Sequence, residues 1–416
     1  MILDIINKKR LGKELSYKEL DFFFNGYLNG EIADYQMSSL LMAICINGMT
    51  DEETYALTKI FIDSGDILDF SDIEGIKVDK HSTGGIGDKT TLIIAPIVAS
   101  LGIPVIKMSG RGLGYTGGTI DKLESIPGFK INLRESEIRQ QVLDIGIALT
   151  GQTRDLVPMD KVIYALRDVT STVSSVPLIA SSIMSKKIAS GADKILIDIK
   201  VGNGALLQTK EEAKKLSSLM KKTGEFYGKE VRTIISDMNT PLGKCIGNAL
   251  EVEEAIDVLK GKEDDNNLFD LCVELASEMV SMGKEISTEE AKKMVIDSID
   301  DGKALKKLKE FVEYQGGNLN EIKVSDKTVS IKSTFSGEIK KINALALGKL
   351  SLSLGAGKLK KNQRIDHSVG IKLNKLVGDS VKKGDVLMTL YVNKDTPDVN
   401  IEDIFTIEWK KYLILK

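Results

Sequence analysis

The sequence is poor in the residues that build metal clusters and disulfide frameworks. It has 2 histidines and 3 cysteines among 416 residues. The cysteines, Cys45, Cys245 and Cys272, lie far apart and lack the spacing of metal ligands. They are expected to be reduced thiols in the core of a cytoplasmic protein.

The sequence also lacks a large excess of charge of one sign and a long uninterrupted apolar run. The 57 basic and 60 acidic residues are mixed along the chain, so no basic stripe can follow a nucleic-acid backbone. The longest apolar stretch, 91–108, contains prolines and carries Lys107, which predicts a buried helix and a strand instead of a membrane span. Asp4 precedes the basic residues 8–10, the reverse of an export signal. Neither nucleic acid nor membrane is an expected partner.

The N-terminal part has a helical pattern. Capping boxes at 16–19 and 50–53 are each followed by apolar residues at three- and four-residue spacing, which predicts a helical domain over 1–68. A further helical segment at about 158–192 is predicted to join this domain. The sequence alone does not prove that return.

The rest of the chain changes from an α/β pattern to a β-rich one. Short β-branched runs alternate with amphipathic stretches over 69–157 and 193–329, which predicts an α/β core with a mostly parallel sheet. The segment 330–416 is rich in glycine, lysine and turn signals. It is predicted to be a separate C-terminal α+β domain.

A glycine-rich loop, 80–88, lies between a strand expected to end near Val78 and a helix expected to begin near Thr90. Such a turn exposes backbone N–H groups at a helix N-terminus, where an anion can bind. Lys80 and Ser82 would add a cation and a hydroxyl. The alternative is a turn that binds no ligand, but a Lys-His pair is unusual on a loop without a function.

The second loop, 107–124, has the same position after a strand and before a helix. Ser109 and Thr119 supply hydroxyls, and Lys107 and Arg111 supply charge. Its glycines allow close approach of the backbone to a ligand. Because both loops follow strands of an α/β sheet, they are expected to converge on one crevice.

Three nucleotide or cofactor motifs are rejected. Asp88 separates Gly87 from Lys89, so the ending of an ATP-binding loop is absent. The G-x-G-x-x-G match over 112–117 lacks the acidic residue that accompanies NAD binding. The turn at 377–386 resembles a biotinyl or lipoyl carrier but lacks its Met-Lys-Met hairpin. No organic cofactor is expected.

Four segments in order resemble the thymidine and pyrimidine-nucleoside phosphorylase family. They are KHSTGGIGD (80–88), SGRGLGYTGGTIDKLE (109–124), YALRDVTSTV (164–173) and SSIMSKK (181–187). The resemblance covers nearly the whole chain and implies a fold like that of nucleoside phosphorylases and phosphoribosyltransferases. It implies a phosphate site made of Lys80, Ser82, Thr91, Ser109 and Thr119. The second loop's pattern adds Lys107 to this set.

The resemblance also implies a pyrimidine site formed by Arg167, Ser182 and Lys186, with Tyr164 beside them. Negative charge develops on the departing base, so donors such as Arg167 and Lys186 suit the transition state. Their alternative role is surface salt bridging. The family places the counterpart of His81 beside the pyrimidine carbonyl, where it could donate a proton. Arg167, Lys186 and His81 are thus the predicted catalytic residues.

The segment 236–255 resembles the family's branch of broader specificity, which holds a monovalent cation. The potassium ligands implied here come from Gly87, Lys89, Leu242, Cys245 and Glu254. Mostly carbonyl oxygens with one carboxylate suit such an ion. A helix-surface role for Glu254 is the alternative, and potassium is a hypothesis.

The sequence departs from the usual family pattern at four positions. Tyr115 stands where histidine is common and Thr240 where glutamine is common, which leaves the base and sugar preference open. Lys89 replaces a smaller residue and Cys245 replaces alanine, and both belong to the cation set.

The resemblance implies reversible phosphorolysis of uridine, deoxyuridine and thymidine to the base and (deoxy)ribose 1-phosphate, in nucleoside salvage. It also implies a homodimer formed through the helical domain, with a cleft that closes on substrate. Three alternatives stay open: a thymidine-specific phosphorylase, a phosphoribosyltransferase of the anthranilate type, and a non-catalytic nucleoside-binding protein.

Overall fold

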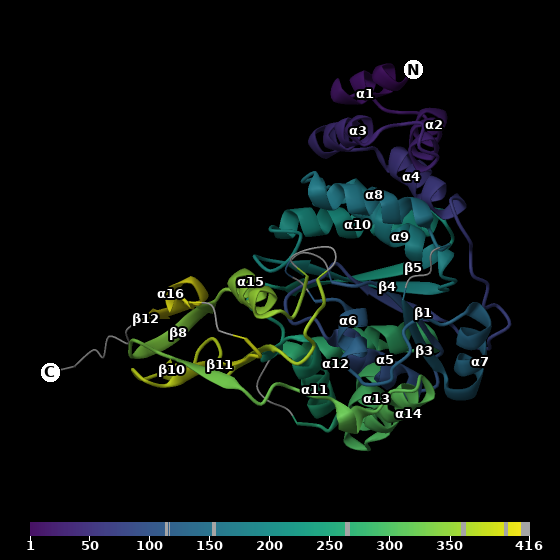
Figure 1. Ribbon diagram of the computed structural model, residues 1–416. Coiled ribbons are helices and arrows are strands. Elements are labelled where there is room, and N and C mark those ends of the chain that lie inside the picture. The colour runs from purple at the N-terminus through teal and green to yellow at the C-terminus, as the bar shows by residue number, and fades with distance from the viewer. Residues whose placement is uncertain are drawn as a thin grey trace. The chain divides into compact units, whose positions relative to one another are not determined.

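The computed structural model describes residues 1–112, 115, 117–151, 155–262, 267–358, 363–394 and 398–408 (Figure 1). Contacts within the chain divide it into two compact units. The first unit comprises Met1–His81, Gln152–Ile199 and Thr209–Ile235, and the second comprises Ser82–Gly151, Lys200–Gln208 and Ser236–Lys416. None of the described helices is both long and apolar enough to cross a membrane.

The first unit begins with four helices, α1 (Ile2–Arg10), α2 (Tyr17–Leu28), α3 (Asp34–Asn47) and α4 (Asp51–Asp63). Of these, α2 and α4 start at the predicted capping boxes. The Ser16 and Thr50 hydroxyls accept the backbone N–H groups of Glu19 and Glu53. Both predicted N-termini are therefore confirmed.

Three later helices return to this N-terminal group. α8 (Pro158–Val169) packs against α2, α3 and α4, and α9 (Val176–Ala189) packs against α4. α10 (Lys210–Phe226) contacts α9 and α4. The return that the sequence left unproven is thus present in the structure.

A sheet of order β1-β4-β5 completes the first unit. Its strands are β1 (Val78–Ser82), β4 (Lys194–Val201) and β5 (Glu230–Asp237), whose last residues belong to the second unit. The central strand β4 is buried along nearly its whole length, as its apolar sequence requires. The contacts group α10 and β5 with the first unit, whereas the sequence grouped them with the core. The predicted domain boundaries stay a prediction.

The second unit contains a parallel strand pair and a layer of helices. β2 (Val105–Ser109) pairs in parallel with β3 (Ile147–Gly151). α5 (Thr90–Ser100) is buried nearly all round, because α11, α12, α13 and α14 all contact it. The predicted helix and strand within 91–108 are confirmed. The helices of this unit before the C-terminal part are α5, α6 (Thr119–Glu124), α7 (Glu135–Ile145), α11 (Asn248–Leu259), α12 (Asn267–Lys284), α13 (Thr288–Asp300) and α14 (Lys303–Tyr314).

The C-terminal part consists of two antiparallel sheets and short helices, which confirms its predicted α+β class. One sheet has the order β6-β9-β11-β7, and the other has the order β10-β8-β12. The strands are β6 (Cys245–Ile246), β7 (Thr328–Lys332), β8 (Gly337–Ile342), β9 (Gly370–Leu373), β10 (Ser380–Val381), β11 (Val386–Tyr391) and β12 (Phe405–Glu408). The helices are η1 (Leu319–Glu321), α15 (Ala344–Leu354) and α16 (Ile401–Ile404). Because β6 precedes α11 in the chain, this sheet joins the C-terminal part to the segment around residue 245.

A buried ion pair fixes the N-terminal helices. Lys9 Nζ lies 2.8 Å from both carboxylate oxygens of Glu53, and the two side chains are 3% and 2% exposed. The same carboxylate accepts the N–H groups of Leu15 and Thr50. One carboxylate thereby joins α1, the turn after it and the start of α4.

Glu53→Gln is expected to lower the free energy of unfolding of the helical part by about 3 kcal/mol, because it leaves the Lys9 ammonium buried without a counter-charge. Chemical denaturation followed by circular dichroism measures the loss. Lys59→Ala is the control: its pair with Asp63 is about half exposed, and its loss should change the stability by less than about 0.5 kcal/mol. Equal effects of the two substitutions would contradict the assignment.

Candidate active site

The first glycine-rich loop is organised by Asp88. Its carboxylate accepts hydrogen bonds from the Ser82 and Thr90 hydroxyls, each at 2.6 Å, and from the Thr90 N–H. The residue that breaks the ATP-binding motif therefore ties the end of β1 to the start of α5. Gly87 has a φ of +74°, and a Cβ there would lie 2.7 Å from the Leu242 carbonyl oxygen. Only glycine fits that position.

Lys200 supports this loop, although the sequence did not identify it as a site residue. Its side chain is fully buried, its Nζ lies 3.9 Å from the Asp88 carboxylate and it donates to the Ser236 hydroxyl. Its backbone N–H donates to the Thr83 hydroxyl. The sequence does contain a sign of this role, because a charged residue within the largely apolar strand 195–201 needs a buried partner.

The second loop contains a buried hydroxyl, that of Ser109. Ser109, the last residue of β2, is 8% exposed, and its Oγ has no hydrogen-bond partner among the described residues. Leaving a buried hydroxyl unpaired costs about 1–3 kcal/mol, a cost that a bound oxyanion would remove. Lys107 on the same strand is 7% exposed, and Thr119 begins α6. These three predicted residues thus lie around one loop.

Arg111 and Asp121 shape the second loop. Asp121 accepts the backbone N–H groups of Gly112 at 2.6 Å and Gly118 at 3.3 Å. The Arg111 guanidinium, expected to supply charge to a ligand, instead pairs with Asp121 and Glu124. The remaining G-x-G-x-x-G glycine, Gly114, lies outside the described residues.

Helix α11 holds both loops through buried lysines. Lys89, directly after the first loop, pairs with Glu254. Lys122, near the end of the second loop, pairs with Glu251 at 3.3 Å. Glu251 and Glu254 are three residues apart and so lie on one face of the helix. The Lys122 ammonium also donates to the Gly117 carbonyl at 3.0 Å. The arrangement of both loops therefore depends on one helix.

Helix α15 also contacts both loops. A Cβ at Gly348 would lie 2.4 Å from Ile86 of the first loop and 3.0 Å from the carbonyl of Tyr115 in the second. The Lys349 ammonium lies 5.4 Å above the Tyr115 ring. The two loops thus approach each other at α15, as expected of loops that follow strands.

The oxygens implied to bind potassium surround the Lys89 ammonium. Lys89 Nζ donates to the carbonyls of Leu242 at 2.9 Å and Cys245 at 2.8 Å, and to Glu254 Oε2 at 2.5 Å. The Gly87 carbonyl accepts the backbone N–H of Lys89. Because the lysine uses this set of acceptors, the residues present do not fit an additional potassium ion. The alternative surface role of Glu254 is wrong, since its side chain is 10% exposed and paired.

The predicted pyrimidine-site residues form one cluster on α8 and α9. Lys186 Nζ donates to the Ser182 hydroxyl at 2.8 Å and to Asp160 Oδ2 at 2.5 Å. Two cations lie near the Tyr164 ring, the Arg167 guanidinium at 5.5 Å and the Lys186 ammonium at 5.9 Å from its centroid. Asp160, four residues before Tyr164, was missed because its sequence position gives no sign of its partner on α9.

Arg167 organises the connection between these two helices. It is 1% exposed and donates to the backbone carbonyls of Thr172, Val173 and Leu178. Burial lowers the pKa of its guanidinium, opposed by the charge of Asp160. Surface salt bridging is therefore the wrong interpretation of Arg167. Its contact with a pyrimidine stays a prediction.

Strand β1 carries Lys80, His81 and Ser82 in succession. Lys80 is 2% exposed and pairs with the fully buried Asp198 of β4 at 3.3 Å. His81 is half-buried. Its role as a proton donor stays a prediction.

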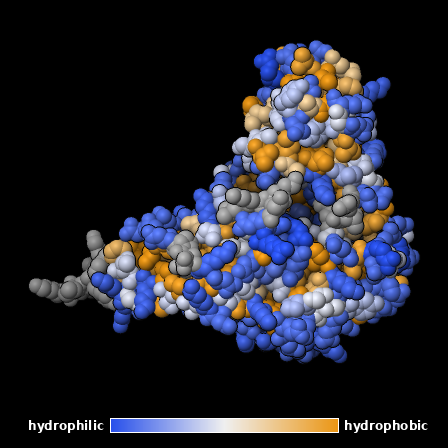
Figure 2. Space-filling view, in the orientation of Figure 1, coloured by the Kyte–Doolittle hydropathy of each residue, from blue (hydrophilic) through white to orange (hydrophobic). Residues whose placement is uncertain are grey.

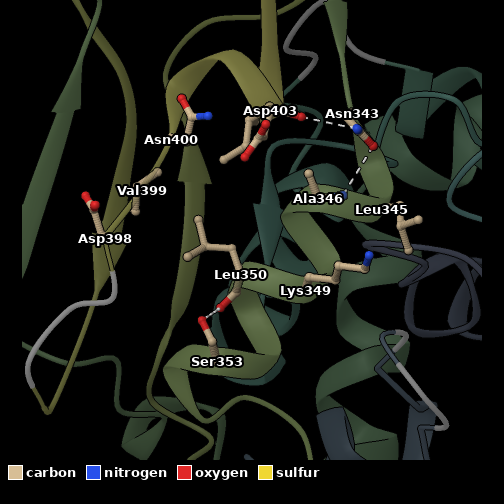
Figure 3. A pocket seen from close by; sticks show the side chains of 11 residues that line it. Asn343, Leu345, Ala346, Lys349, Leu350, Ser353, Asp398, Val399, Asn400 and Asp403 are labelled. Carbon is tan, nitrogen blue, oxygen red and sulfur yellow. Dashed lines mark hydrogen bonds between the residues drawn. The ribbon is translucent and has the colours of Figure 1, made fainter.

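A cavity of about 480 Å³ lies elsewhere, between α15, α16 and residues 398–400 (Figure 3). Its polar wall includes Asn343, which donates to the Asp403 carbonyl at 3.2 Å, and the Lys349 side chain. None of the predicted site residues lines it. Cavity size alone therefore does not locate the predicted chemistry.

Comparisons with known proteins show the family and the fold of the chain. Family models match residues 3–65 (glycosyl transferase family, helical bundle domain), 74–305 (glycosyl transferase family, a/b domain) and 338–406 (pyrimidine nucleoside phosphorylase C-terminal domain). The chain also resembles the anthranilate phosphoribosyltransferase of Thermus thermophilus in fold, with a TM-score of 0.60 over 75% of this chain and 99% of that one, at 17% identity.

Curated relatives extend the match along nearly the whole chain. The pyrimidine-nucleoside phosphorylase of Staphylococcus haemolyticus is 50% identical, over 97% of this chain and 94% of the relative. That of Staphylococcus epidermidis is 50% identical, over 98% of this chain and 96% of the relative. With three family models and these relatives in agreement, the chain belongs to the pyrimidine-nucleoside phosphorylase family.

Proposed function

We propose that this protein catalyses the reversible phosphorolysis of uridine, deoxyuridine and thymidine. The observation that carries the proposal is the buried Ser109 hydroxyl, which has no hydrogen-bond partner among the described residues and lies in a glycine-rich loop that α11 holds beside a second such loop. The names of the relatives and of the C-terminal family model supply the substrate class. A role in nucleoside salvage in the cytoplasm is part of the same proposal.

Phosphate binding is assigned to the two loops. The hydroxyls of Ser82, Thr91, Ser109 and Thr119 would donate to phosphate oxygens, and Lys80 and Lys107 would balance their charge. Buried donors fixed before phosphate arrives need little reorganisation on binding, which strengthens their interaction with the attacking oxyanion. The glycine-rich backbone allows the ion to approach closely.

The bond to the base is broken as phosphate attacks the sugar C1′ from the opposite face. The glycosidic electron pair leaves with the base, while a phosphate oxygen forms the new bond to C1′. Lys186 and Ser182 would stabilise the charge that develops on the base, and Asp160 holds the ammonium in place. His81 would donate the proton that the base takes up. Arg167, donating to carbonyls between α8 and α9, keeps this cluster in position.

A homodimer formed through the helical part belongs to the proposal. Tyr35, Met42 and Ile46 lie at helical spacing on one face of α3 and are 74%, 39% and 75% exposed. Leu3 on the neighbouring α1 is 73% exposed. Figure 2 shows apolar side chains at the surface of the N-terminal helices. Such a patch is typical of an interface between subunits.

The proposed activity is tested by following base release by ultraviolet absorbance. Uridine, deoxyuridine and thymidine should each be cleaved only when phosphate is present, because phosphate is the attacking group. No phosphate-dependent cleavage of any pyrimidine nucleoside would overturn the proposal. Consumption of phosphoribosyl pyrophosphate with anthranilate would favour the phosphoribosyltransferase alternative.

Ser109→Ala should raise the KM for phosphate by at least about 10-fold, since a hydrogen bond to a charged group contributes about 1.5–3 kcal/mol. It should not lower the thermal stability, because the hydroxyl has no partner among the described residues. The matched control is Ser277→Ala, which removes a buried hydroxyl that donates to the Val273 carbonyl at 2.6 Å. The control should lose some stability and keep its KM for phosphate. The reverse pattern would refute the phosphate role of Ser109.

Ile46→Glu should convert the dimer to a monomer in sedimentation experiments, because it places a charge within the apolar face of α3. Ile235→Glu is the control, since Ile235 is also exposed, at 38%, but lies on β5. A wild-type protein that sediments as a monomer would contradict the dimer.

A further inference from the structure

We infer that the ammonium group of Lys89 is a built-in replacement for a monovalent metal cation beside the phosphate loops. Three of the residues that the family resemblance implied as potassium ligands hold this ammonium instead. The chain should therefore fold and act without potassium. The part of this inference that concerns activity rests on the proposed function, whereas the part that concerns cation binding does not.

The ammonium is fully coordinated. An ammonium has three N–H donors, and the acceptors are the Leu242 carbonyl, the Cys245 carbonyl and Glu254 Oε2, at 2.9, 2.8 and 2.5 Å. The Lys89 side chain is 0% exposed. A buried lysine is stable only when its charge is paired and its donors are used. Both conditions are met by the same oxygens that would bind a metal ion.

The oxygen cage is held by bonds other than those of the lysine. Glu254 accepts the backbone N–H groups of Lys244 at 2.6 Å and Cys245 at 2.9 Å. The Leu242 N–H donates to the Ile86 carbonyl at 3.0 Å. A cage fixed in this way is expected to keep its shape when the lysine side chain is shortened, and to admit a free cation in its place.

The surrounding charges keep Lys89 protonated. Burial alone would lower its pKa, but the negative charges of Glu254 and Glu251 and the hydrogen bond to Glu254 outweigh burial, so the pKa is raised. A metal ion beside the ammonium would face a like charge at short range in a buried site. The ammonium therefore excludes the ion by charge as well as by position.

A covalently attached cation has a different consequence from a dissociable one. A free ion stabilises its site according to its concentration. The Lys89 side chain is always present. It therefore holds the end of the first loop at any salt composition, together with Asp88 directly before it and Thr90 directly after it, which are hydrogen-bonded to each other. The phosphate loop should thus be insensitive to which alkali cation the buffer contains.

The test compares potassium with sodium at equal ionic strength in the full-length protein. Wild-type protein should show the same midpoint of thermal unfolding and the same phosphate-dependent turnover in both salts. Crystals soaked in rubidium chloride should show no anomalous peak in the cage. A several-fold rise in wild-type turnover with potassium, or a rubidium peak bonded to Leu242, Cys245 and Glu254, would overturn the inference.

The variant Lys89→Ser empties the cage of its cation. In sodium its unfolding midpoint should fall by about 5 °C or more, because Glu254 is left without its counter-charge. Potassium should restore part of this loss, and rubidium should bind in the cage. The control Lys9→Ser also removes a buried lysine, but among the described residues the ammonium of that lysine is bonded only to a carboxylate. It should lose stability without recovery in potassium.

A Lys89→Ser protein that regains no more stability in potassium than Lys9→Ser would contradict the inference. If Lys89→Ser does not fold, the comparison of wild-type protein in potassium and sodium and the rubidium soak still test the cation replacement. If the protein cleaves no pyrimidine nucleoside, the proposed function fails, while the unfolding midpoints and the anomalous scattering continue to test the cation replacement.

Discussion

The second unit depends on the pairing of two buried lysines with two carboxylates of one helix. Lys89 and Lys122 reach Glu254 and Glu251 of α11 from the two glycine-rich loops. Loops rich in glycine have high conformational entropy in the unfolded chain, so they need strong contacts to keep one shape. The paired charges supply these contacts, and each ammonium also donates to loop or neighbouring carbonyls. This arrangement supports the proposed binding of an anion by the backbone of the two loops.

The same constraint separates structural charges from those left for a ligand. Asp88 and Asp121 use their oxygens on hydroxyls and backbone N–H groups of their own loops. The Ser109 hydroxyl, by contrast, has no hydrogen-bond partner among the described residues. On α8 and α9, Asp160 likewise holds Lys186, and Arg167 holds the backbone. Asp88 thus holds the predicted ligand Ser82, and Asp160 holds the predicted ligand Lys186. Neither aspartate was itself predicted to bind a ligand.

The sequence predicted what depends on local signals and on resemblance. The capping residues Ser16 and Thr50 marked two helix starts, and the predicted fold class and family resemblance are both confirmed. The partners of the buried charges could not be predicted, because Lys89 and Glu254 are 165 positions apart and meet only through folding. The prediction that Arg111 supplies charge to a ligand was wrong for the same reason. Its partners Asp121 and Glu124 come close to it only through the turn between them. A charged residue within an apolar strand, such as Lys200, indicates a buried partner even where the sequence does not identify that partner.

The central claim is that the two loops held by α11 form a phosphate site, and a crystal structure of the protein with phosphate tests it most directly. The claim predicts phosphate oxygens within hydrogen-bond distance of Ser109 Oγ and of the Ser82 or Thr119 hydroxyl, with Lys89 and Lys122 still paired to α11. Phosphate bound elsewhere, with the Ser109 hydroxyl still lacking a partner, would contradict it.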